Sequence, residues 1–404
     1  MKQKKLMLLG GSHYLMPAIE AAHKLGAEVI TCDYLPDNYA HKFSDAYYNI
    51  SVIDKDAVLA KAQELEIDGI LGFANDAGVV PAAYVATQMG LPTPPLESVE
   101  ILQNKDKFRD FLAAHGFNCP WHKNYPSVTA ALADSETLSY PCIVKPVDSC
   151  GSKGVTVVES AAEFEQACEI ASMRAFSGRI IVEEFLRQVG SSSDTDCFSI
   201  GNELVFCSFN CQHFDAQAEN PYTPAAYSWP SDMPREIQTE LRSELQRLIR
   251  LLNMRTSVYN VETRLAENGK PYIMEVSPRT GGNRLSECLK LATGQDLIEN
   301  NVRGALGLPL LPMSDPVYNG AWAEFIVHSN KAGKFVSLDI DPSFAEKHLV
   351  QNDLWVSPGD SISEFTGANQ TIGTLVLKFD SHAQAEAYLA KPGDWHKVVV
   401  RGKY

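Results

Sequence analysis

The chain has 404 residues, of which 45% are hydrophobic and 21% are charged, a composition typical of a soluble globular protein with two or three packed units. Its formal net charge of −15 argues against a nucleic-acid backbone or an anionic membrane as the main partner, but leaves room for a local basic pocket that binds phosphates. The nine cysteines include no CxxC pair, which favours reduced thiols in a cytoplasm over disulfides or zinc sites.

The first 95 residues alternate predicted strands with predicted helices. The basic start is followed by an apolar run of only Leu6 to Leu9, too short for a signal peptide and typical of a first strand. The strands KLMLLGG, EVITCDY and DGILGF alternate with the helices MPAIEAAHKLGA and DKDAVLAKAQELE. This order predicts a parallel, doubly wound sheet in an N-terminal Rossmann-like domain over residues 1–95. Gly10-Gly11 and Asp33 leave a nicotinamide-dependent oxidoreductase as an alternative, although GxGxxG is absent.

The proline-rich stretch Leu91 to Leu102 predicts a domain boundary. A mixed unit of helices and strands follows over residues 96–312, with a lid at about 120–186. Within it, Asn210 to Pro234 is polar, aromatic and aperiodic, which predicts a long functional or mobile loop. Residues 313–404 are mostly predicted strands with the helix HAQAEAYLA, which predicts a small C-terminal β-rich domain.

Two basic segments are candidates for phosphate contacts. In IVKPVDSCGSKGVTVV, a strand presents Lys145 before a turn of small residues whose backbone amides can approach an anion. An ordinary turn remains the alternative. The segment NKDKFRDF places Lys105, Lys107 and Arg109 on the first turns of a helix, where a solvated face is the alternative.

The segment VYNVETRLAENGKPYIMEVSPR reads as a β-hairpin around Asn268-Gly269. Counting from that turn places Glu262 and Glu275 on facing strands, where two carboxylates repel unless a cation lies between them. A hard divalent ion would satisfy both. Ser277 lies on the same face as Glu275, and two residues further Arg279 can grip a phosphoryl group or a carboxylate with both arms of its guanidinium.

This ordered set of two lysines, a glycine loop, an acidic strand end and a carboxylate hairpin that runs into an arginine resembles the ATP-grasp family, over roughly Lys105 to Leu308. The resemblance implies an α/β ATP-grasp fold, α+β in its ATP-binding part, similar to carbamoyl-phosphate synthase, phosphoribosylglycinamide synthetase and L-amino acid ligases. It implies ATP and Mg²⁺ (or Mn²⁺) as cofactors, with Glu262, Glu275 and Ser277 at the metal and Arg279 and Ser277 in catalysis. The residues that would contact ATP are Lys107, Lys145, Gly151, Ser152, Gly154, Glu183, Glu184, Phe185, Leu186 and Asp194.

Three positions depart from the pattern that the resemblance implies. Ser277 stands where the family usually has asparagine, and a hydroxyl is a weaker magnesium ligand. Ser192 stands near the usual ribose-binding glutamate, so Asp194 is the candidate for the ribose. Cys150 replaces a common glycine and is interpreted as a tolerated small residue.

By this resemblance the protein is expected to be an ATP-dependent ligase that joins a small-molecule carboxylate to an amine through an acyl phosphate, releasing ADP and phosphate. A nucleotide-binding protein with a decayed site is the alternative. A cytoplasmic location is expected, a homodimer is possible, and no nucleic-acid or membrane partner is expected. The aromatic segment from Cys211 to Pro230 is interpreted as a specificity loop, with an ordinary surface loop as the alternative. The candidate substrate contacts are His213, Tyr227, Trp229 and Arg284.

Overall fold

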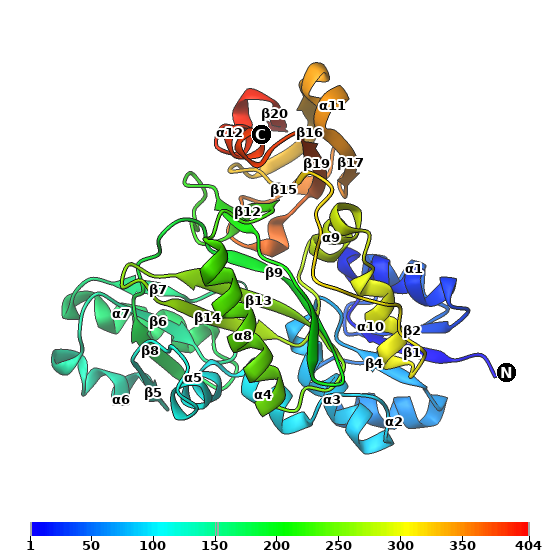
Figure 1. Ribbon diagram of the computed structural model, residues 1–404, viewed down its shortest axis with the longest axis horizontal. Coiled ribbons are helices and arrows are strands. Elements are labelled where there is room, and N and C mark those ends of the chain that lie inside the picture. The colour runs from blue at the N-terminus through cyan, green and yellow to red at the C-terminus, as the bar shows by residue number, and fades with distance from the viewer. Residues whose placement is uncertain (1, 150, 152, 403–404) are drawn as a thin grey trace.

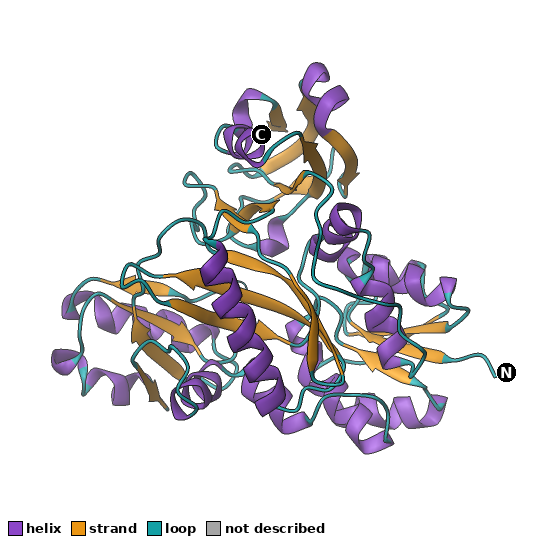
Figure 2. Ribbon diagram, in the orientation of Figure 1, coloured by secondary structure: helices purple, strands orange, loops and turns teal. Residues whose placement is uncertain are grey.

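The computed structural model describes residues 2–149, 151 and 153–402, and its elements form three regions around a central antiparallel sheet (Figures 1 and 2). The N-terminal region is blue in Figure 1, the central region cyan to green, and the C-terminal region orange to red. Among the described residues, no helix is both long enough and apolar enough to cross a membrane.

The N-terminal region is built on a parallel sheet of order β3-β2-β1-β4, which confirms the predicted parallel sheet. Leu6 and Leu8 of the first strand face one hydrophobic cluster while Met7 and Leu9 face another, so both faces of the sheet are covered. The third strand was not predicted because it is short and only partly buried. The elements are β1 (Lys5–Leu9), η1 (His13–Leu15), α1 (Met16–Lys24), β2 (Glu28–Asp33), η2 (Tyr39–Lys42), β3 (Ala46–Asn49), α2 (Lys55–Leu65), β4 (Gly69–Leu71) and α3 (Asp76–Met89).

A proline-rich connector leads through α4 (Leu96–Gln103) and α5 (Lys105–Ala114) into a small antiparallel sheet of order β5-β8-β6-β7. One face of this sheet packs on α7 around the fully buried Phe164. The elements are β5 (His122–Tyr125), α6 (Val128–Leu132), η3 (Ser135–Thr137), β6 (Cys142–Pro146), β7 (Thr156–Val158), α7 (Ala161–Arg174) and β8 (Ile180–Glu184).

The central sheet has the order β10-β9-β13-β14 and is antiparallel throughout. The long helix α8 (Arg235–Leu251) crosses one face in Figure 1 and buries Leu241, Leu245 and Leu248, which share one face of the helix. The other face carries the polar side chains described below. The remaining elements are β9 (Ser193–Ile200), β10 (Glu203–Cys207), β13 (Ser257–Leu265), β14 (Pro271–Ser277), α9 (Leu285–Thr293) and α10 (Leu297–Ala305).

The segment Asn210 to Pro234, predicted as a loop, contains a β-hairpin instead. Its two strands join the C-terminal strands in a sheet of order β11-β12-β15-β19-β17, beside a second sheet of order β18-β16-β20. This sheet therefore crosses the boundary predicted at residue 313. The elements are β11 (Cys211–Phe214), β12 (Pro224–Trp229), β15 (Ala321–Val327), β16 (Gly333–Ile340), α11 (Pro342–His348), β17 (Leu349–Leu354), β18 (Ser361–Ile362), η4 (Ala368–Gln370), β19 (Gly373–Phe379), α12 (His382–Leu389), η5 (Pro392–Asp394) and β20 (His396–Arg401).

Candidate active site

Three carboxylates lie side by side on the central sheet. In the strand register Glu262 of β13 is opposite Glu275 of β14 on one side and opposite Asp194 of β9 on the other, so the predicted facing pair is confirmed. Arg264 lies 3.0 Å from Glu262, and Lys105 Nζ lies 3.6 Å from a Glu275 oxygen. Each carboxylate of the pair thus has a cationic neighbour, and both remain about one-third exposed, so ligands can reach them.

Asp194, the candidate for the ribose contact, lies in a buried environment beside a second carboxylate. Burial raises the pKa of Asp194 to about 7, and the Glu262 carboxylate adds to the shift. Asn260 donates a hydrogen bond to Asp194 (2.8 Å), and Tyr227 Oη donates another (3.2 Å). A bound cation would lower this pKa again. The ribose contact stays a prediction, whereas the position beside Glu262 fits a cation.

Arg279 and Ser277 both contact Asp76, a residue that the sequence reasoning did not select. The Nε and Nη2 atoms of Arg279 each donate to one Asp76 oxygen at 2.8 Å, and Ser277 Oγ donates to the same carboxylate at 2.8 Å. Burial opposes ionisation of Asp76, but Arg279 outweighs it and holds the pKa of Asp76 below its usual value. Gln103 also donates to Ser277 Oγ at 2.6 Å. The N-terminal region therefore orients the strand end that carries the predicted catalytic residues.

Lys145 is held by a buried ion-pair triad. Its Nζ donates to Glu183 Oε2 at 2.6 Å, while Arg109 Nε lies 2.9 Å from Glu183 Oε1. Glu183 is 1% exposed, and despite its burial the two cations lower its pKa to about 2. Glu183 was predicted beside the nucleotide, but its carboxylate is occupied in orienting Lys145. The solvated-face interpretation is wrong for Arg109, which is 2% exposed.

Lys105, rather than Lys107, is directed toward the carboxylate pair. Lys107 is 45% exposed and its Nζ lies 3.1 Å from Glu100 on the outer side of the helix. Lys105 is 18% exposed, donates to the Ser149 carbonyl at 2.8 Å and lies near Glu275. Side chains two residues apart on a helix point in nearly opposite directions, so only one of the two lysines can face the carboxylate pair, and the sequence alone does not show which. The structure does not support the predicted role of Lys107.

The predicted glycine loop connects β6 with β7. Gly151 and Gly154 have φ values of +66° and +75°, and a Cβ at Gly154 would lie 2.9 Å from the Arg174 side chain. Glycine is therefore required at this turn. Cys150 and Ser152 lie outside the described residues.

The predicted adenine-binding segment follows β8. The Glu184 amide donates to the Trp121 carbonyl at 2.9 Å, so this amide is occupied within the protein. Leu186 is 5% exposed and packs with Ala266 and Tyr272. The roles of Phe185 and Leu186 at the nucleotide stay predictions.

The four candidate substrate contacts lie in different environments. Trp229 is completely buried and donates from Nε1 to Thr195 Oγ1 at 3.3 Å, so its predicted ligand contact is wrong and it serves the core. Only Tyr227 reaches the carboxylate cluster through its hydroxyl. His213 Nε2 lies 2.9 Å from Ser228 Oγ and 3.4 Å from Glu386, toward the C-terminal helix. Arg284 Nη2 donates to Glu287 at 2.7 Å.

The buried carboxyl of Glu324 extends this acidic region. The sequence did not reveal it, because its place near the site depends on the pairing of Glu324 with Tyr227 on a distant strand. Glu324 is 0% exposed and accepts a hydrogen bond from the Arg284 amide at 2.8 Å. Burial raises its pKa to about 8. A second buried carboxyl, Asp196, accepts hydrogen bonds from the Gly281 amide and Ser286.

The raised pKa of Glu324 predicts a pH-dependent stability. Between its unfolded pKa of 4.5 and its folded pKa of about 8, the folded state keeps a proton that the unfolded state releases, so stability falls as the pH rises through this window. We expect Glu324→Gln to unfold at a higher urea concentration than the wild type at pH 8, a gain of roughly 1–3 kcal/mol, and to match it within about 1 kcal/mol at pH 5. Parallel pH profiles of the two proteins would contradict the assignment.

Gly10 and Gly11, which suggested a dinucleotide site, serve close packing in this structure. A Cβ at Gly11 would lie 2.4 Å from the His41 ring and 2.6 Å from Asn38 Cβ. The protein's own side chains therefore fill the space over this turn.

Comparison with known proteins finds a matching domain family and similar chains. Residues 102–283 match the family model described as "ATP-grasp domain". The formate-dependent phosphoribosylglycinamide formyltransferase of Parasynechococcus marenigrum is 26% identical over 317 residues, which cover 76% of this chain and 78% of the relative. The corresponding enzyme of Burkholderia pseudomallei is 29% identical over 324 residues, which cover 76% of each chain.

Two solved structures share the fold over nearly the whole chain. The L-amino acid ligase from Bacillus licheniformis superposes with a TM-score of 0.82 at 21% identity, covering 100% of both chains. Phosphoribosylglycinamide synthetase from Anaerococcus prevotii superposes with a TM-score of 0.77 at 20% identity, covering 99% of this chain and 100% of that one. The likeness confirms the predicted fold class.

Proposed function

This chain contains an ATP-grasp domain and has the ATP-grasp fold, and from this premise we propose that it is an ATP- and Mg²⁺-dependent ligase that joins a carboxylate to an amine. The observation that carries the proposal is the strand register, which places Glu262 between Glu275 and Asp194. The names of the compared proteins include formate-dependent formyl transfer and L-amino acid ligation, both of which fit a carboxylate donor and an amine acceptor.

The carboxylate cluster fits a divalent cation by the chemistry of its oxygen donors. Glu262 and Glu275, with Asp194 beside them, would hold Mg²⁺. Burial raises the pKa of Asp194 to about 7 and the Glu262 carboxylate adds to the shift, and a cation bound here would favour the ionised form. When bound, the ion supplies charge neutralisation for the transferring phosphoryl group.

The remaining chemistry needs positioning rather than a protein nucleophile. An oxygen of the substrate carboxylate attacks the γ-phosphorus of ATP, the bond to the bridging oxygen breaks, and ADP leaves. The amine then attacks the acyl carbon, phosphate leaves, and the amine nitrogen loses a proton. Lys145 and Lys105 would bind phosphate oxygens, and Arg279 would stabilise the charge on the transferring group.

The products and the intermediate test this proposal. We expect a screen over pairs of carboxylates and amines, with ATP and Mg²⁺, to release ADP and phosphate for at least one pair. With that carboxylate, hydroxylamine in place of the amine should trap the acyl phosphate as a hydroxamate. AMP as the nucleotide product would contradict the acyl-phosphate mechanism.

A nucleotide-binding protein without turnover is the second candidate, and the environment of Ser277 favours it. Ser277 is 1% exposed and its hydroxyl already has Asp76 and Gln103 as partners, so it is not open to a metal in this structure. ATP binding in the presence of Mg²⁺, without phosphate release for any pair in the screen, would favour this candidate over the ligase.

The two lysine positions give a prediction for nucleotide affinity. Lys145→Ala should raise the Kd for ATP by about 10- to 100-fold, because a charge-assisted contact contributes roughly 1.5–3 kcal/mol. Lys107→Ala is the matched control, and we expect its Kd to change by less than about twofold, because exposed ion pairs contribute little. Calorimetric titration with a non-hydrolysable ATP analogue measures both. Equal losses in the two variants would contradict the assignment of Lys145.

A further inference from the structure

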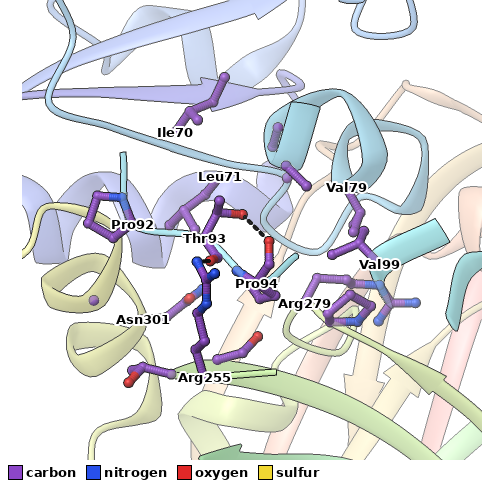
Figure 3. Close-up of a pocket in the computed structure, with 18 of the residues that line it drawn as sticks. Ile70, Leu71, Val79, Pro92, Thr93, Pro94, Val99, Arg255, Arg279 and Asn301 are labelled. Carbon is purple, nitrogen blue, oxygen red and sulfur yellow. Dashed lines mark hydrogen bonds between the residues drawn. The ribbon is translucent and has the colours of Figure 1, made fainter. Parts of the chain in front are cut away.

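A cavity of about 420 Å³ lies between the N-terminal region and the central sheet, apart from the carboxylate cluster (Figure 3). Its walls come from β4, α3, the connector Pro92–Pro94, the start of β13 and α10. Apolar side chains such as Leu71, Val79 and Val99 line much of it. Among the described residues that line this cavity, none is Lys145, Glu262 or Glu275 of the candidate active site. The volume is suited to a small molecule.

One buried polar side chain is open toward this cavity. Asn301 of α10 is 8% exposed and lines the cavity, yet its amide has no hydrogen-bond partner among the described residues. The neighbouring Asn300 shows the usual arrangement, since its side chain donates to and accepts from the Leu311 backbone at 3.1 and 2.7 Å. The polar atoms of the Asn301 amide are not enclosed by protein but reach the space of the cavity, where a ligand can supply their hydrogen bonds.

Arg255 is placed in the wall of the cavity by an unusual backbone conformation. Its φ is +58°, in the left-handed region that non-glycine residues rarely adopt. Its carbonyl accepts hydrogen bonds from the Asn202 amide (2.8 Å) and Ser199 Oγ (2.9 Å), which stabilise this conformation. The guanidinium donates to the Thr93 carbonyl at 3.0 Å, and Figure 3 shows it on the same side of the cavity as Asn301. Backbone strain of this kind is frequent at ligand-binding positions.

The charges of the wall have one sign. The charged residues among the described lining are Arg255 and Arg279, and no carboxylate belongs to that lining. Arg279 is engaged by Asp76, whereas the Arg255 guanidinium donates to the neutral carbonyl of Thr93. The positive charge of Arg255 is therefore offset by no carboxylate in the wall.

We propose that this cavity binds a small organic anion with an apolar body, of the class of aliphatic or aromatic monocarboxylates with about four to eight carbons. The carboxylate of the ligand contacts Arg255 and the Asn301 amide, and its hydrocarbon part packs against the walls from β4 and α3. The wall shares Arg279 with the proposed ATP site, but Arg255 and Asn301, which contact the ligand, are assigned to neither ATP nor the metal, so the proposal does not depend on the ligase reaction.

The test is a titration of the full-length protein with straight-chain carboxylates from butanoate to octanoate and with benzoate, followed by ligand-observed NMR and calorimetry. We expect at least one probe to bind with a Kd below about 1 mM, and the alcohol of the same carbon number to bind at least about tenfold more weakly, because it lacks the charge that Arg255 recognises. Asn301→Leu and Arg255→Gln should each weaken the best probe by about fivefold or more.

Two further variants separate this cavity from the carboxylate cluster. Gly304→Leu adds a side chain to the wall from α10, where a Cβ has only ordinary contacts at 3.6 and 4.0 Å, and should abolish probe binding. Leucine is also a better helix former than glycine, so this variant should fold, which thermal unfolding verifies. Glu275→Gln should leave probe binding unchanged. The proposal is overturned if no probe binds, if the alcohols bind as well as the carboxylates, or if binding is lost in Glu275→Gln but kept in Gly304→Leu.

Discussion

Replacing Glu275 with glutamine is expected to reduce turnover by a factor on the order of 10³. The change removes a negatively charged oxygen donor from the site of phosphoryl transfer while keeping the shape of the side chain. The register places Glu275 directly opposite Glu262, so Glu262 and Asp194 are left as the charged donors. The measurement is ADP release with the best substrate pair. In addition, the stimulation of nucleotide binding by Mg²⁺ should be lost, and calorimetry measures this without any acceptor.

Glu267→Gln on the same hairpin is the matched control, since Glu267 is exposed and lies beside the turn. It should retain the wild-type rate and the wild-type magnesium dependence. The metal assignment would be wrong if Glu275→Gln kept more than about a tenth of the wild-type turnover, because a direct ligand contributes more than that.

The site features that the sequence predicted correctly depend on local geometry. The short turn around Asn268-Gly269, closed by the hydrogen bond from the Ala266 amide to the Lys270 carbonyl, joins the two strands as a hairpin, and alternation along β14 places Glu275 and Ser277 on one face. Counting from the turn placed Glu262 and Glu275 on facing strands, but it would set Glu262 opposite Met274. A β-bulge between Glu262 and Thr263 shifts the register by one residue and brings Glu262 opposite Glu275. The parallel N-terminal sheet is equally local, because a strand followed by a helix and a second strand has one common arrangement.

The features that the sequence did not reveal depend on contacts between distant segments. Asp76 is about 200 positions before Ser277 and Arg279, and only the packing of the N-terminal region against the central sheet brings them together. Its one signal was its place just after β4, where parallel strands present polar side chains. Trp229 looked like a loop aromatic because β12, which carries it, pairs with β15 about a hundred residues later in the chain.

Asp76 also shows that Arg279 acts within a pre-formed arrangement. The Asp76 carboxylate accepts a hydrogen bond from the Arg279 guanidinium at each of its two oxygens, and it also accepts one from Ser277. These two parallel hydrogen bonds fix the orientation of the planar guanidinium. The side chains of Arg279 and Asp76 are 12% and 19% exposed, so solvent screens the pair only partly. Loss of Asp76 would leave a largely buried guanidinium without its main partner.

We therefore expect Arg279→Lys to lower turnover by a factor on the order of 10² while the Kd for ATP stays within about threefold, because lysine keeps the charge but cannot reproduce the two parallel hydrogen bonds. Asp76→Asn should lower turnover less and should also lower the melting temperature, since asparagine keeps the shape of the contact but loses its charge. Asp37→Asn, at an exposed position of the same region, should change neither. A loss of ATP affinity in Arg279→Lys as large as its loss of turnover would mean that Arg279 binds the nucleotide in its ground state rather than the transferring phosphoryl group, because an interaction made only in the transition state leaves ground-state binding intact.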